Sequence, residues 1–433
     1  MTLSTPQDAP TQPDPDTGID PRAAWPAVTA ADSDTAGALS GIRVLDLSRV
    51  LAGPLASQMM ADQGAEVIKV EAPTGDETRG WGPPFLTTDE DAGDQASSAY
   101  FTGMNHSKSN ICLDLRSTEG REILGALLDG ADVVVENFKA GTLARWGFDY
   151  ETVLADRRPD LVYTRITGFG VDGPMGGDPG YDAVLQSFGG LMSVNGYPDG
   201  NPLRVGVPIV DIVAANMAFS GTLLALLERT RSGKGQLVDI TLLDAVISML
   251  HPHAANWTHS GITPVRTGDP HPTVVPYQVF TAADGDVFIS AANNRQFASL
   301  TEVLGVGELA QDARFRTNRD RHEHRDELIS ILRSVIITRD RGELATALDA
   351  AGVASSPVNT VAEALTEPQV LHRDLFLDTP EYRGVGIPLK LSRSRSRTPQ
   401  SPVGRGTHSE QILTAMGYPE DRIAAMRENG ILG

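Results

Sequence analysis

Short apolar stretches alternate with longer amphipathic segments through the first part of the chain. The apolar stretches predict buried strands, and the amphipathic segments predict helices. Expected strands lie within 42–50, 66–73, 109–115, 132–138 and 161–169, and expected helices lie within 53–65, 119–131 and 140–145. Because the two kinds of element alternate, the sequence predicts βαβ units and an α/β fold on a parallel sheet. Ligands of such sheets bind at the carboxyl ends of the strands, which here carry Arg49–Val50, Glu71, Asn137–Phe138 and Gly168–Gly170.

A long apolar run later in the chain begins next to Asp211. No residue from Ile212 to Leu227 is charged, which predicts a helix buried on most sides. Asp211 is then expected at the N-cap of this helix, where backbone N–H groups and the helix dipole favour the ionised carboxylate. A lone aspartate in this position is usually a capping residue. The same environment can also keep a carboxylate nucleophile ionised and partly desolvated.

The rest of the pattern predicts the domain organisation. After Pro264, short strands, turns and helices predict a smaller α+β domain over 265–365. A large domain is expected over 39–245 and a linker over 246–264, and residues 366–433 are expected to form a linker and return to the large domain. Residues 1–38 are rich in Pro, Ala, Thr and Asp, which predicts a disordered acidic tail.

The charge of the chain limits its partners. The formal net charge is −20 and the pI is about 4.8. Because nucleic acids and anionic membranes attract basic surfaces, neither is expected as a partner. The uncharged run after Asp211 is shorter than the ~18 residues of a membrane span, and the sequence has no pattern of a secretion signal, so the expected location is the cytoplasm. The single cysteine, Cys112, is flanked by apolar residues, which predicts a core position.

Two patterns suggest ligand sites but lack the context that such sites need. GFGVDG at 168–173 has the spacing of a dinucleotide-binding loop, but Pro174 follows it and its third glycine opens no helix. Four histidines lie between His251 and His271 without the spacing of ligands on one helix face, so no metal site is expected. Basic residues near the strand ends either line a site for a phosphate-bearing ligand or lie singly on the solvated surface. They are Lys69, Arg79, Lys108, Arg116 and Arg145.

Several segments, taken in order, resemble the class III CoA-transferases. They are VLDLSRVLAGPLASQMMADQGAEVIKVE, GDETRGWGPPF, YFTGMNHSKSNICLDL, VVVENFKAGTLARWGF, GYDAV, VPYQVFTAADG and GTHSEQILTAMGY. The family includes formyl-CoA and carnitine CoA-transferases and the α-methylacyl-CoA racemases. The resemblance extends from about Gly41 to Gly433 and leaves only the N-terminal tail uncovered.

The resemblance implies that Asp211 is the catalytic nucleophile. Racemases of the family carry a histidine thirty positions before this aspartate, whereas the transferases commonly carry a tyrosine, and this chain has Tyr181 there. A tyrosine ionises near pH ~10 and is a poor proton shuttle at neutral pH, so CoA transfer is expected. An acyl-CoA racemase that uses Asp211 with a different base, and a non-catalytic CoA-binding protein, remain as alternatives.

Other site residues are carried over by position. The resemblance implies contacts to CoA from Val50, Arg116, Asn137, Phe138 and Arg145. Tyr181, Arg49 and Arg79 are candidates for the pocket of the acid substrate. Formyl-CoA transferases have an arginine where Ala72 stands and a lysine near Pro179, so the contacts to the nucleotide end of CoA are left open.

The resemblance also implies the substrates and the assembly. The segments GDETRGWGPPF, AANNRQF and VPYQVFTAADG look most like the succinyl-CoA:dicarboxylate branch, with glutarate or a related diacid as acceptor. The expected partners are therefore acyl-CoA and small carboxylic acids, with the CoA thioester as a substrate and no separate cofactor or metal. CoA is expected to pass through an aspartyl-acyl anhydride and an aspartyl-CoA thioester. The large domain is expected to be Rossmann-like and to hold both chain ends, and two chains are expected to interlock as a homodimer.

Overall fold

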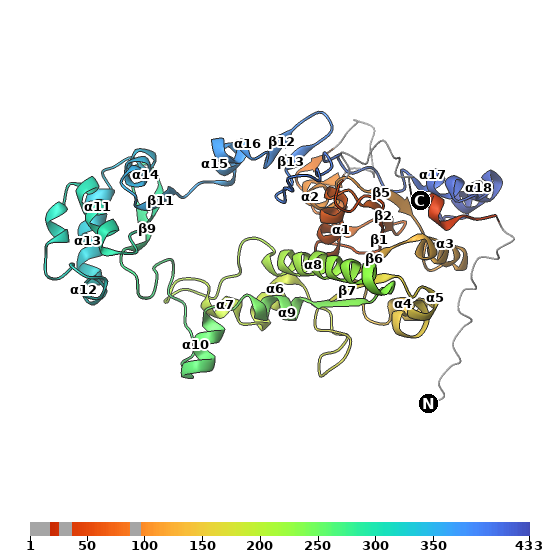
Figure 1. Cartoon of the computed structure of the whole chain (residues 1–433), viewed down its shortest axis with the longest axis horizontal. Helices are drawn as coiled ribbons and strands as arrows, with labels where there is room; N and C mark the ends of the chain where they lie inside the picture. Colours follow the sequence, from red (N-terminus) through yellow and green to blue (C-terminus); the bar gives the residue numbers. More distant parts are fainter. Residues whose placement is uncertain (1–17, 26–36, 87–96) are drawn as a thin grey trace. The chain divides into compact units, whose positions relative to one another are not determined.

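The computed structural model describes residues 18–25, 37–86 and 97–433 (Figure 1). These residues belong to two compact units. The first unit is drawn from Met1–Gly189, Gly206–Leu250 and His372–Gly433, and the second is formed by Gly190–Val205 and His251–Leu371. Most of the tail expected at 1–38 lies outside the described residues.

A six-stranded parallel sheet forms the centre of the first unit, in the order β5–β2–β1–β6–β7–β8. The strands are β1 (Arg43–Asp46), β2 (Glu66–Glu71), β5 (Ser109–Cys112), β6 (Val133–Glu136), β7 (Val162–Thr167) and β8 (Leu237–Thr241). The chain adds strands outward in both directions from the β1–β6 pair, which is a doubly wound arrangement. The expected α/β fold on a parallel sheet is therefore confirmed. In such a sheet, the crevice where the strand order reverses is the usual ligand site.

The helices of this unit pack on the sheet through their apolar faces. Helix α1 contacts β1, β2 and β6, whereas α3 contacts β1, and α17 contacts β5. Helix α3 begins where the Ser117 hydroxyl accepts the N–H of Gly120, and it buries Ile123, Leu124 and Leu127. The helices are α1 (Ala52–Asp62), α2 (Ala99–Asn105), α3 (Thr118–Gly130), α4 (Thr142–Arg145), α5 (Ala155–Arg157), α6 (Asp182–Phe188), α8 (Ile209–Ser232), α9 (Leu242–Ser248), α17 (Ser409–Ala415) and α18 (Glu420–Glu428). The first unit also contains two short antiparallel strand pairs. They are β3 (Phe85–Leu86) with β4 (Ser97–Ser98), and β12 (Phe376–Asp378) with β13 (Arg383–Val385).

Helix α8 is longer than the uncharged run that predicts it. It begins at Ile209, and its N-cap is Pro208, so the prediction that Asp211 is the N-cap is wrong. Asp211 lies in the first turn, because the apolar residues Ile209 and Val210 extend the helix upstream. By length and composition α8 could cross a membrane. One side of α8 packs against α1, β7, β8 and α9. Eight of its 24 residues are buried, so the prediction of a helix buried on most sides is wrong, because the opposite face of α8 is exposed.

The end of the chain completes the β5 edge of the sheet. Asn110 accepts two backbone hydrogen bonds from this region. The N–H of Gly406 donates to its side-chain oxygen at 2.6 Å, and the N–H of His408 donates to its backbone carbonyl at 3.0 Å. The N–H of Cys112 donates to the Ser409 hydroxyl at 3.1 Å. Cys112 is buried and unpaired, which confirms its predicted core position. The last residues therefore stabilise a strand from the first quarter of the fold.

Part of the segment expected to be a disordered tail is folded. Residues Pro21–Ala24 form the short 3-10 helix η2, which packs on α3, and the N–H of Asp20 donates to the carbonyl of Met416 at 2.9 Å. Trp25 is buried. The acidic composition of the segment does not predict this folding. Ala24 and Trp25 stabilise it by burying apolar surface in the core of the first unit.

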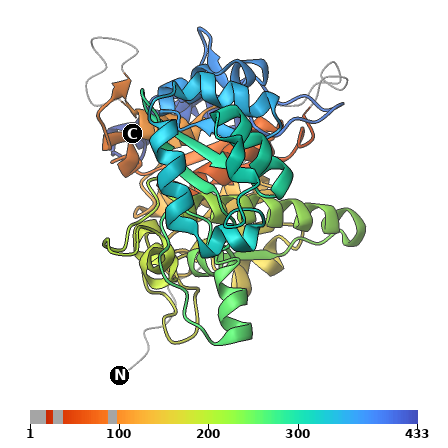
Figure 2. The ribbon, with the colours of Figure 1, turned by 90° about the vertical axis from the view of Figure 1, so that its left-hand side faces the viewer.

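The second unit has its own core around a three-stranded antiparallel sheet, β11–β10–β9 (Figure 2). Helix α13 packs on β9, and α14 packs on β10, β11 and α11. The strands are β9 (Tyr277–Thr281), β10 (Asp286–Ser290) and β11 (Ala354–Pro357). The helices are α7 (Leu191–Val194), α10 (His253–Ser260), α11 (Asn294–Leu304), α12 (Asn318–Glu323), α13 (Arg325–Ile336), α14 (Arg341–Ala350) and α15 (Val361–Thr366), and α16 (Pro368–His372) ends at the boundary. Helix α10 lies within the range expected to be a linker.

Candidate active site

The loops that follow β1 and β6 meet at the point where the strand order reverses. The Asn137 side chain joins them, because its oxygen accepts the N–H of Arg49 (2.8 Å) and its NH2 group donates to the Arg49 carbonyl (2.7 Å). These two bonds fix the mouth of the crevice that the doubly wound order predicts. The polar residue at the end of β6 is therefore a structural link between the two halves of the sheet.

A cavity of about 210 Å³ opens beside this link. It brings together six of the residues that the sequence singled out: Arg49, Val50, Asn137, Phe138, Tyr181 and Asp211. Arg49 is paired with Glu77 at 3.2 Å, and Tyr181 is 63% exposed, so its ring is accessible to a ligand. Lys139, which the sequence analysis missed, also lines the cavity. Its place directly after Asn137 and Phe138, at the same strand end, was a usable signal.

A second cavity, of about 260 Å³, shares Arg49 and Phe138 with the first. Arg116 lines it, as does Ala72. The Phe138 ring meets the Trp146 ring edge to face, with 5.5 Å between their centroids. Phe138 and Arg49 thus line both cavities.

Several basic residues expected near a phosphate do not reach either cavity. Lys69 and Lys108 are buried and bound to carboxylates, and Arg79 forms a two-pronged pair with Glu71 (2.6 and 2.9 Å). Arg145 donates to Thr142 on its own helix. Lys69, Lys108 and Arg79 are therefore engaged by carboxylates in the fold, and of the five basic residues Arg116 is the one that lines either of these two cavities. Its side chain is exposed and paired with Asp114 at 2.9 Å. The phosphate site stays a prediction.

The two buried lysines belong to a charge cluster under the β1 loop. Asp46 accepts from Lys108 Nζ at 2.9 Å and from the Ser57 hydroxyl at 2.6 Å, and Lys69 Nζ lies 3.1 Å from Asp76. Burial alone would raise the pKa of Asp46, but Lys108 and Lys69 hold it well below its usual range. Burial lowers the pKa of Lys108 to about 8, although Asp46 opposes this shift. Each charge in the cluster thus depends on its partners.

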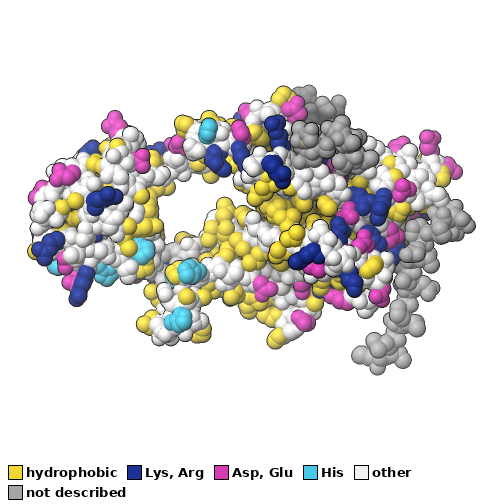
Figure 3. All heavy atoms as spheres, in the orientation of Figure 1, with side chains coloured by type: hydrophobic (Ala, Val, Ile, Leu, Met, Phe, Trp, Pro, Cys, Tyr) yellow, Lys and Arg dark blue, Asp and Glu magenta, His cyan; other side chains and the backbone are white. Residues whose placement is uncertain are grey.

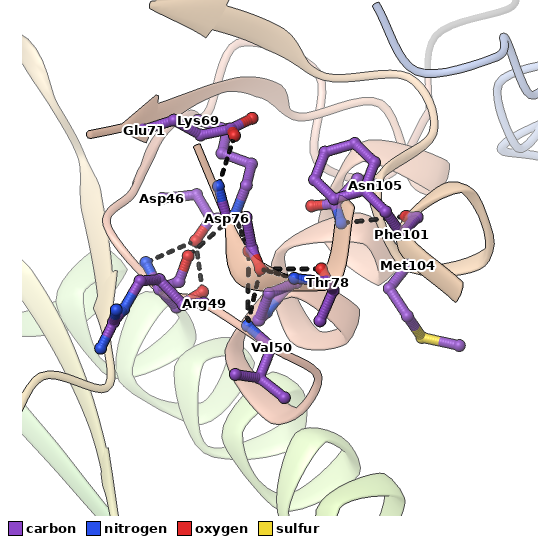
Figure 4. A network of polar contacts seen from close by, with 12 residues as sticks. Asp46, Arg49, Val50, Lys69, Glu71, Asp76, Thr78, Phe101, Met104 and Asn105 are labelled. Atoms are coloured by element: carbon purple, nitrogen blue, oxygen red, sulfur yellow. Dashed lines mark hydrogen bonds and ion pairs between the residues drawn. The ribbon is translucent and has the colours of Figure 1, made fainter. Parts of the chain in front are cut away.

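The cluster also holds the backbone of the loop at the cavity. Asp76 accepts the N–H of Val50 at 3.3 Å and the N–H and hydroxyl of Thr78 at 3.0 and 2.7 Å (Figure 4). Val50 has φ +68°, a left-handed conformation that costs a β-branched residue of the order of 1–2 kcal/mol. The buried Lys69–Asp76 pair therefore offsets backbone strain in a residue that lines the first cavity.

The loop after β7 forms another wall of the first cavity. Gly168 and Gly180 approach so closely that a Cβ on Gly168 would lie 2.5 Å from the nitrogen of Gly180. No helix follows GFGVDG directly, and the next one, α6, begins at Asp182. The glycines of this segment therefore serve close backbone packing, as expected from the missing helix after the third glycine.

Asp211 lies in a setting that disfavours its charge. Burial raises its pKa to about 7, and the nearby carboxylate of Asp182 adds to this shift. Burial also raises the pKa of Tyr100 to about 12, with contributions from the charges of Asp211, Asp182 and Asp76. A carboxylate that ionises near neutral pH at a cavity wall is a strong base and nucleophile for its type. Asp182 was missed from sequence, because its contact with α8 spans a long loop and has no local signal.

Comparison with known proteins identifies the class to which this doubly wound fold and its crevice belong. The pattern of CoA-transferase family III matches residues 39–409. The chain is 40% identical over 384 residues to the succinate–glutarate CoA-transferase of Agrobacterium fabrum, covering 87% of this chain and 95% of the relative. It is 35% identical over 419 residues to the succinyl-CoA:glutarate CoA-transferase of Mus musculus, covering 95% and 94%.

A solved structure agrees with this assignment. The CAIB/BAIF family protein from Brucella suis aligns with a TM-score of 0.83 and 38% identity, covering 88% of this chain and all of that one (100%). The chain belongs to CoA-transferase family III. It is a CoA-transferase, and the resemblance stated from its sequence is confirmed.

Proposed function

We propose that this enzyme moves CoA from succinyl-CoA to a dicarboxylic acid of the glutarate type, with Asp211 as the nucleophile. The observation that carries the proposal is the placement of Asp211 and Tyr181 in one cavity at the reversal of the sheet. The names of the relatives from Agrobacterium fabrum and Mus musculus support the substrate pair. A second carboxylate on each acid would find cations in Arg49 and Lys139, which line the same cavity.

The proposed reaction proceeds through covalent intermediates that retain the free energy of the thioester bond. The Asp211 carboxylate attacks the thioester carbonyl of succinyl-CoA, giving a mixed anhydride and CoA thiolate. The thiolate attacks the aspartyl carbonyl, which forms an aspartyl-CoA thioester and releases succinate. The carboxylate of the acceptor then attacks this thioester, and the thiolate it expels attacks the acceptor acyl carbonyl. The products are the new acyl-CoA and free Asp211.

Asp211 must be ionised for the first step, and the developing oxyanions need hydrogen-bond donors. The N–H groups of Val210 and Asp211 are engaged by Asp182, so the start of α8 is not the donor. The glycine-rich loop from Gly168 to Gly180 lines the cavity and is the better candidate. The long CoA chain would lie across Phe138, with its nucleotide toward Arg116 in the second cavity.

A screen of acceptor acids tests the substrate pair. The enzyme is mixed with succinyl-CoA or acetyl-CoA and with C3 to C6 dicarboxylates or matched monocarboxylates, and acyl-CoA products are measured by mass spectrometry. We expect succinyl-CoA with glutarate to be the best pair by at least about tenfold, because two cations can meet two carboxylates. Equal rates with monocarboxylates would contradict the dicarboxylate preference.

Covalent trapping tests the mechanism separately. Incubation with succinyl-CoA alone, followed by hydroxylamine, is expected to convert Asp211 to a hydroxamate and to inactivate the enzyme, because both covalent intermediates are activated acyl groups. Peptide mass spectrometry locates the modification. An unmodified Asp211 after full turnover would count against the anhydride route.

One observation favours a second candidate, an acyl-CoA racemase. A carboxyl group with a pKa of about 7 is suited to remove an α-proton. Tyr181 in place of histidine speaks against it, because racemisation needs a second base. A single enantiomer of a 2-methylacyl-CoA in heavy water decides the case: deuterium at the α-carbon at a rate near turnover, without an acceptor acid, would establish racemase activity.

We also propose that the enzyme is a homodimer, as the resemblance implies. The outer face of α8 supports this, since Leu224 and Leu227 are 67% and 61% exposed and lie one turn apart. Apolar side chains gather in this region of the surface (Figure 3). Sedimentation of the full chain across a hundredfold range of concentration tests it, and a monomer at all concentrations would contradict it.

A further inference from the structure

Helix α8 begins without a side-chain cap of its own. Its N-cap residue is Pro208, which has no side-chain hydrogen-bonding group, and the structure gives no capping bond from it. The first N–H groups of a helix need partners when they are buried. The N–H of Ile209 donates to the Val207 carbonyl at 2.8 Å, which leaves the N–H groups of Val210, which is buried, and Asp211, which lines the first cavity.

Asp182, at the start of α6, supplies the missing cap. Its Oδ1 accepts the N–H of Val210 at 2.8 Å and the N–H of Asp211 at 3.3 Å. The Gln186 side chain donates to its Oδ2 at 2.6 Å. Asp182 is 9% exposed, so this carboxylate is held from both sides in a nearly dry setting.

We propose that Asp182 is a positioning residue for Asp211: it anchors the first turn of α8 and sets the charge field in which the Asp211 carboxylate works. The proposal rests on the proposed role of Asp211 as nucleophile. The bond to the N–H of Asp211 itself makes the anchor direct. A capped first turn restricts the residue whose carboxylate must attack, and an attacking group misplaced by about 1 Å can cost about a hundredfold in rate.

The charge of Asp182 acts on Asp211 beyond holding it in place. Asp182 raises the pKa of Asp211 in addition to the effect of burial, and a more basic carboxylate is a stronger nucleophile once ionised. Other ionisable groups around it come from several elements. Tyr100 lies near both aspartates, and the cavity that Asp211 lines also contains Arg49, Glu77, Lys139, Asp178 and Tyr181. These groups remain unchanged when Asp182 alone is substituted.

Two substitutions separate the anchor from the charge. Asp182→Asn keeps an oxygen that can accept from Val210 and Asp211, and the Gln186 amide can rotate so that its oxygen accepts from the new NH2 group. Asp182→Ala removes both the anchor and the charge. Asp156→Asn removes the same charge from an exposed position on α5, outside both cavities, and serves as the control.

The experiment measures kcat/KM for CoA transfer between pH 5 and 9, with thermal melting of every variant. For Asp182→Asn we expect the acid limb of the profile to move to lower pH by at least half a unit, with the rate at pH 8 reduced less than about tenfold. Asp182→Ala is expected to lose at least about tenfold more at pH 8. The Asp156→Asn control is expected to match the wild type in both profile and rate.

A stability measurement, which needs no catalytic activity, tests the proposal even if a variant is inactive. The pH dependence of the stability difference between Asp211 and Asp211→Asn is measured in the wild-type and Asp182→Asn backgrounds, since it reports the ionisation of Asp211 directly. Unchanged profiles in both readouts, or Asp182→Ala at wild-type rate, would overturn the proposal. A fully active Asp211→Asn would instead overturn the proposed function and is distinguishable from either result.

Discussion

Asp211→Asn is expected to lose CoA transfer by at least ~10³-fold, because an amide cannot form the anhydride on which every later step depends. The substitution keeps the size and shape of the side chain, and the N–H bonds of the first turn of α8 come from Asp182 and are unaffected. Helix capping is therefore removed as an explanation for any loss. The rate is measured with succinyl-CoA and glutarate at saturating concentrations.

The same variant is expected to be more stable than the wild type at high pH. The pKa of Asp211 is raised from 3.8 to about 7 in the folded protein, so its ionised form is penalised by folding. That penalty is absent below the ordinary pKa of aspartate and is complete above pH ~7, so the gain of the neutral variant grows as the pH rises. We expect ~4 kcal/mol at pH 8 and ~2 kcal/mol at pH 5, measured by urea unfolding. Wild-type transfer together with unchanged stability would exclude Asp211 as the nucleophile.

Asp46→Ala is expected to destabilise the first unit by ~3–5 kcal/mol, because it leaves the buried Lys108 ammonium without its carboxylate. The Ser57 hydroxyl loses the nearer of its two acceptors at the same time and keeps the Pro54 carbonyl at 3.1 Å. Urea unfolding at pH 7 measures the change. At pH 9, above the pKa of about 8 that Lys108 has in the intact cluster, the neutral amine is easier to bury and the loss is expected to be smaller.

An exposed ion pair provides the matched control for this prediction. Arg319 and Glu323 are paired at 2.9 Å, one turn apart on α12, with side chains 86% and 53% exposed. Arg319→Ala is expected to leave the midpoint of urea unfolding unchanged, because exposed ion pairs contribute little to stability. If Asp46→Ala and Arg319→Ala lowered the free energy of unfolding by similar amounts, burial would not determine how much an ion pair stabilises this fold.

The parts of the fold that are predictable from sequence depend on local patterns. Continuous apolar runs such as the one in β6 predict buried parallel strands, and the missing helix after GFGVDG excludes a dinucleotide site. The strand-end rule places Arg49, Val50, Asn137 and Phe138 together, because the carboxyl ends of parallel strands share one edge. These four residues do line one cavity.

The features that escape the sequence depend on contacts between distant segments. Helix α8 begins at Ile209, and the N–H groups of Val210 and Asp211 in its first turn are accepted by Asp182 on another helix. Lys69, Lys108 and Arg79 have the same sequence signal as a phosphate-binding residue, and only burial against carboxylates reveals their structural role. Trp25 is a second example of a contact that the sequence pattern does not reveal. Its burial holds in place a segment whose composition predicts disorder.

The bonds between Asn110 in β5 and the backbone of Gly406 and His408 have a consequence for synthesis of the protein. Strand β5 is an edge of the sheet, and Gly406 of its covering segment leaves the ribosome 296 residues after Asn110. Until then a growing chain exposes an unpaired edge, the kind of surface that recruits other strands. The second unit has its own core and can fold before the edge of β5 is covered. A premature stop before Gly406 is therefore expected to yield an aggregation-prone chain, although such a chain would contain every residue of both cavities.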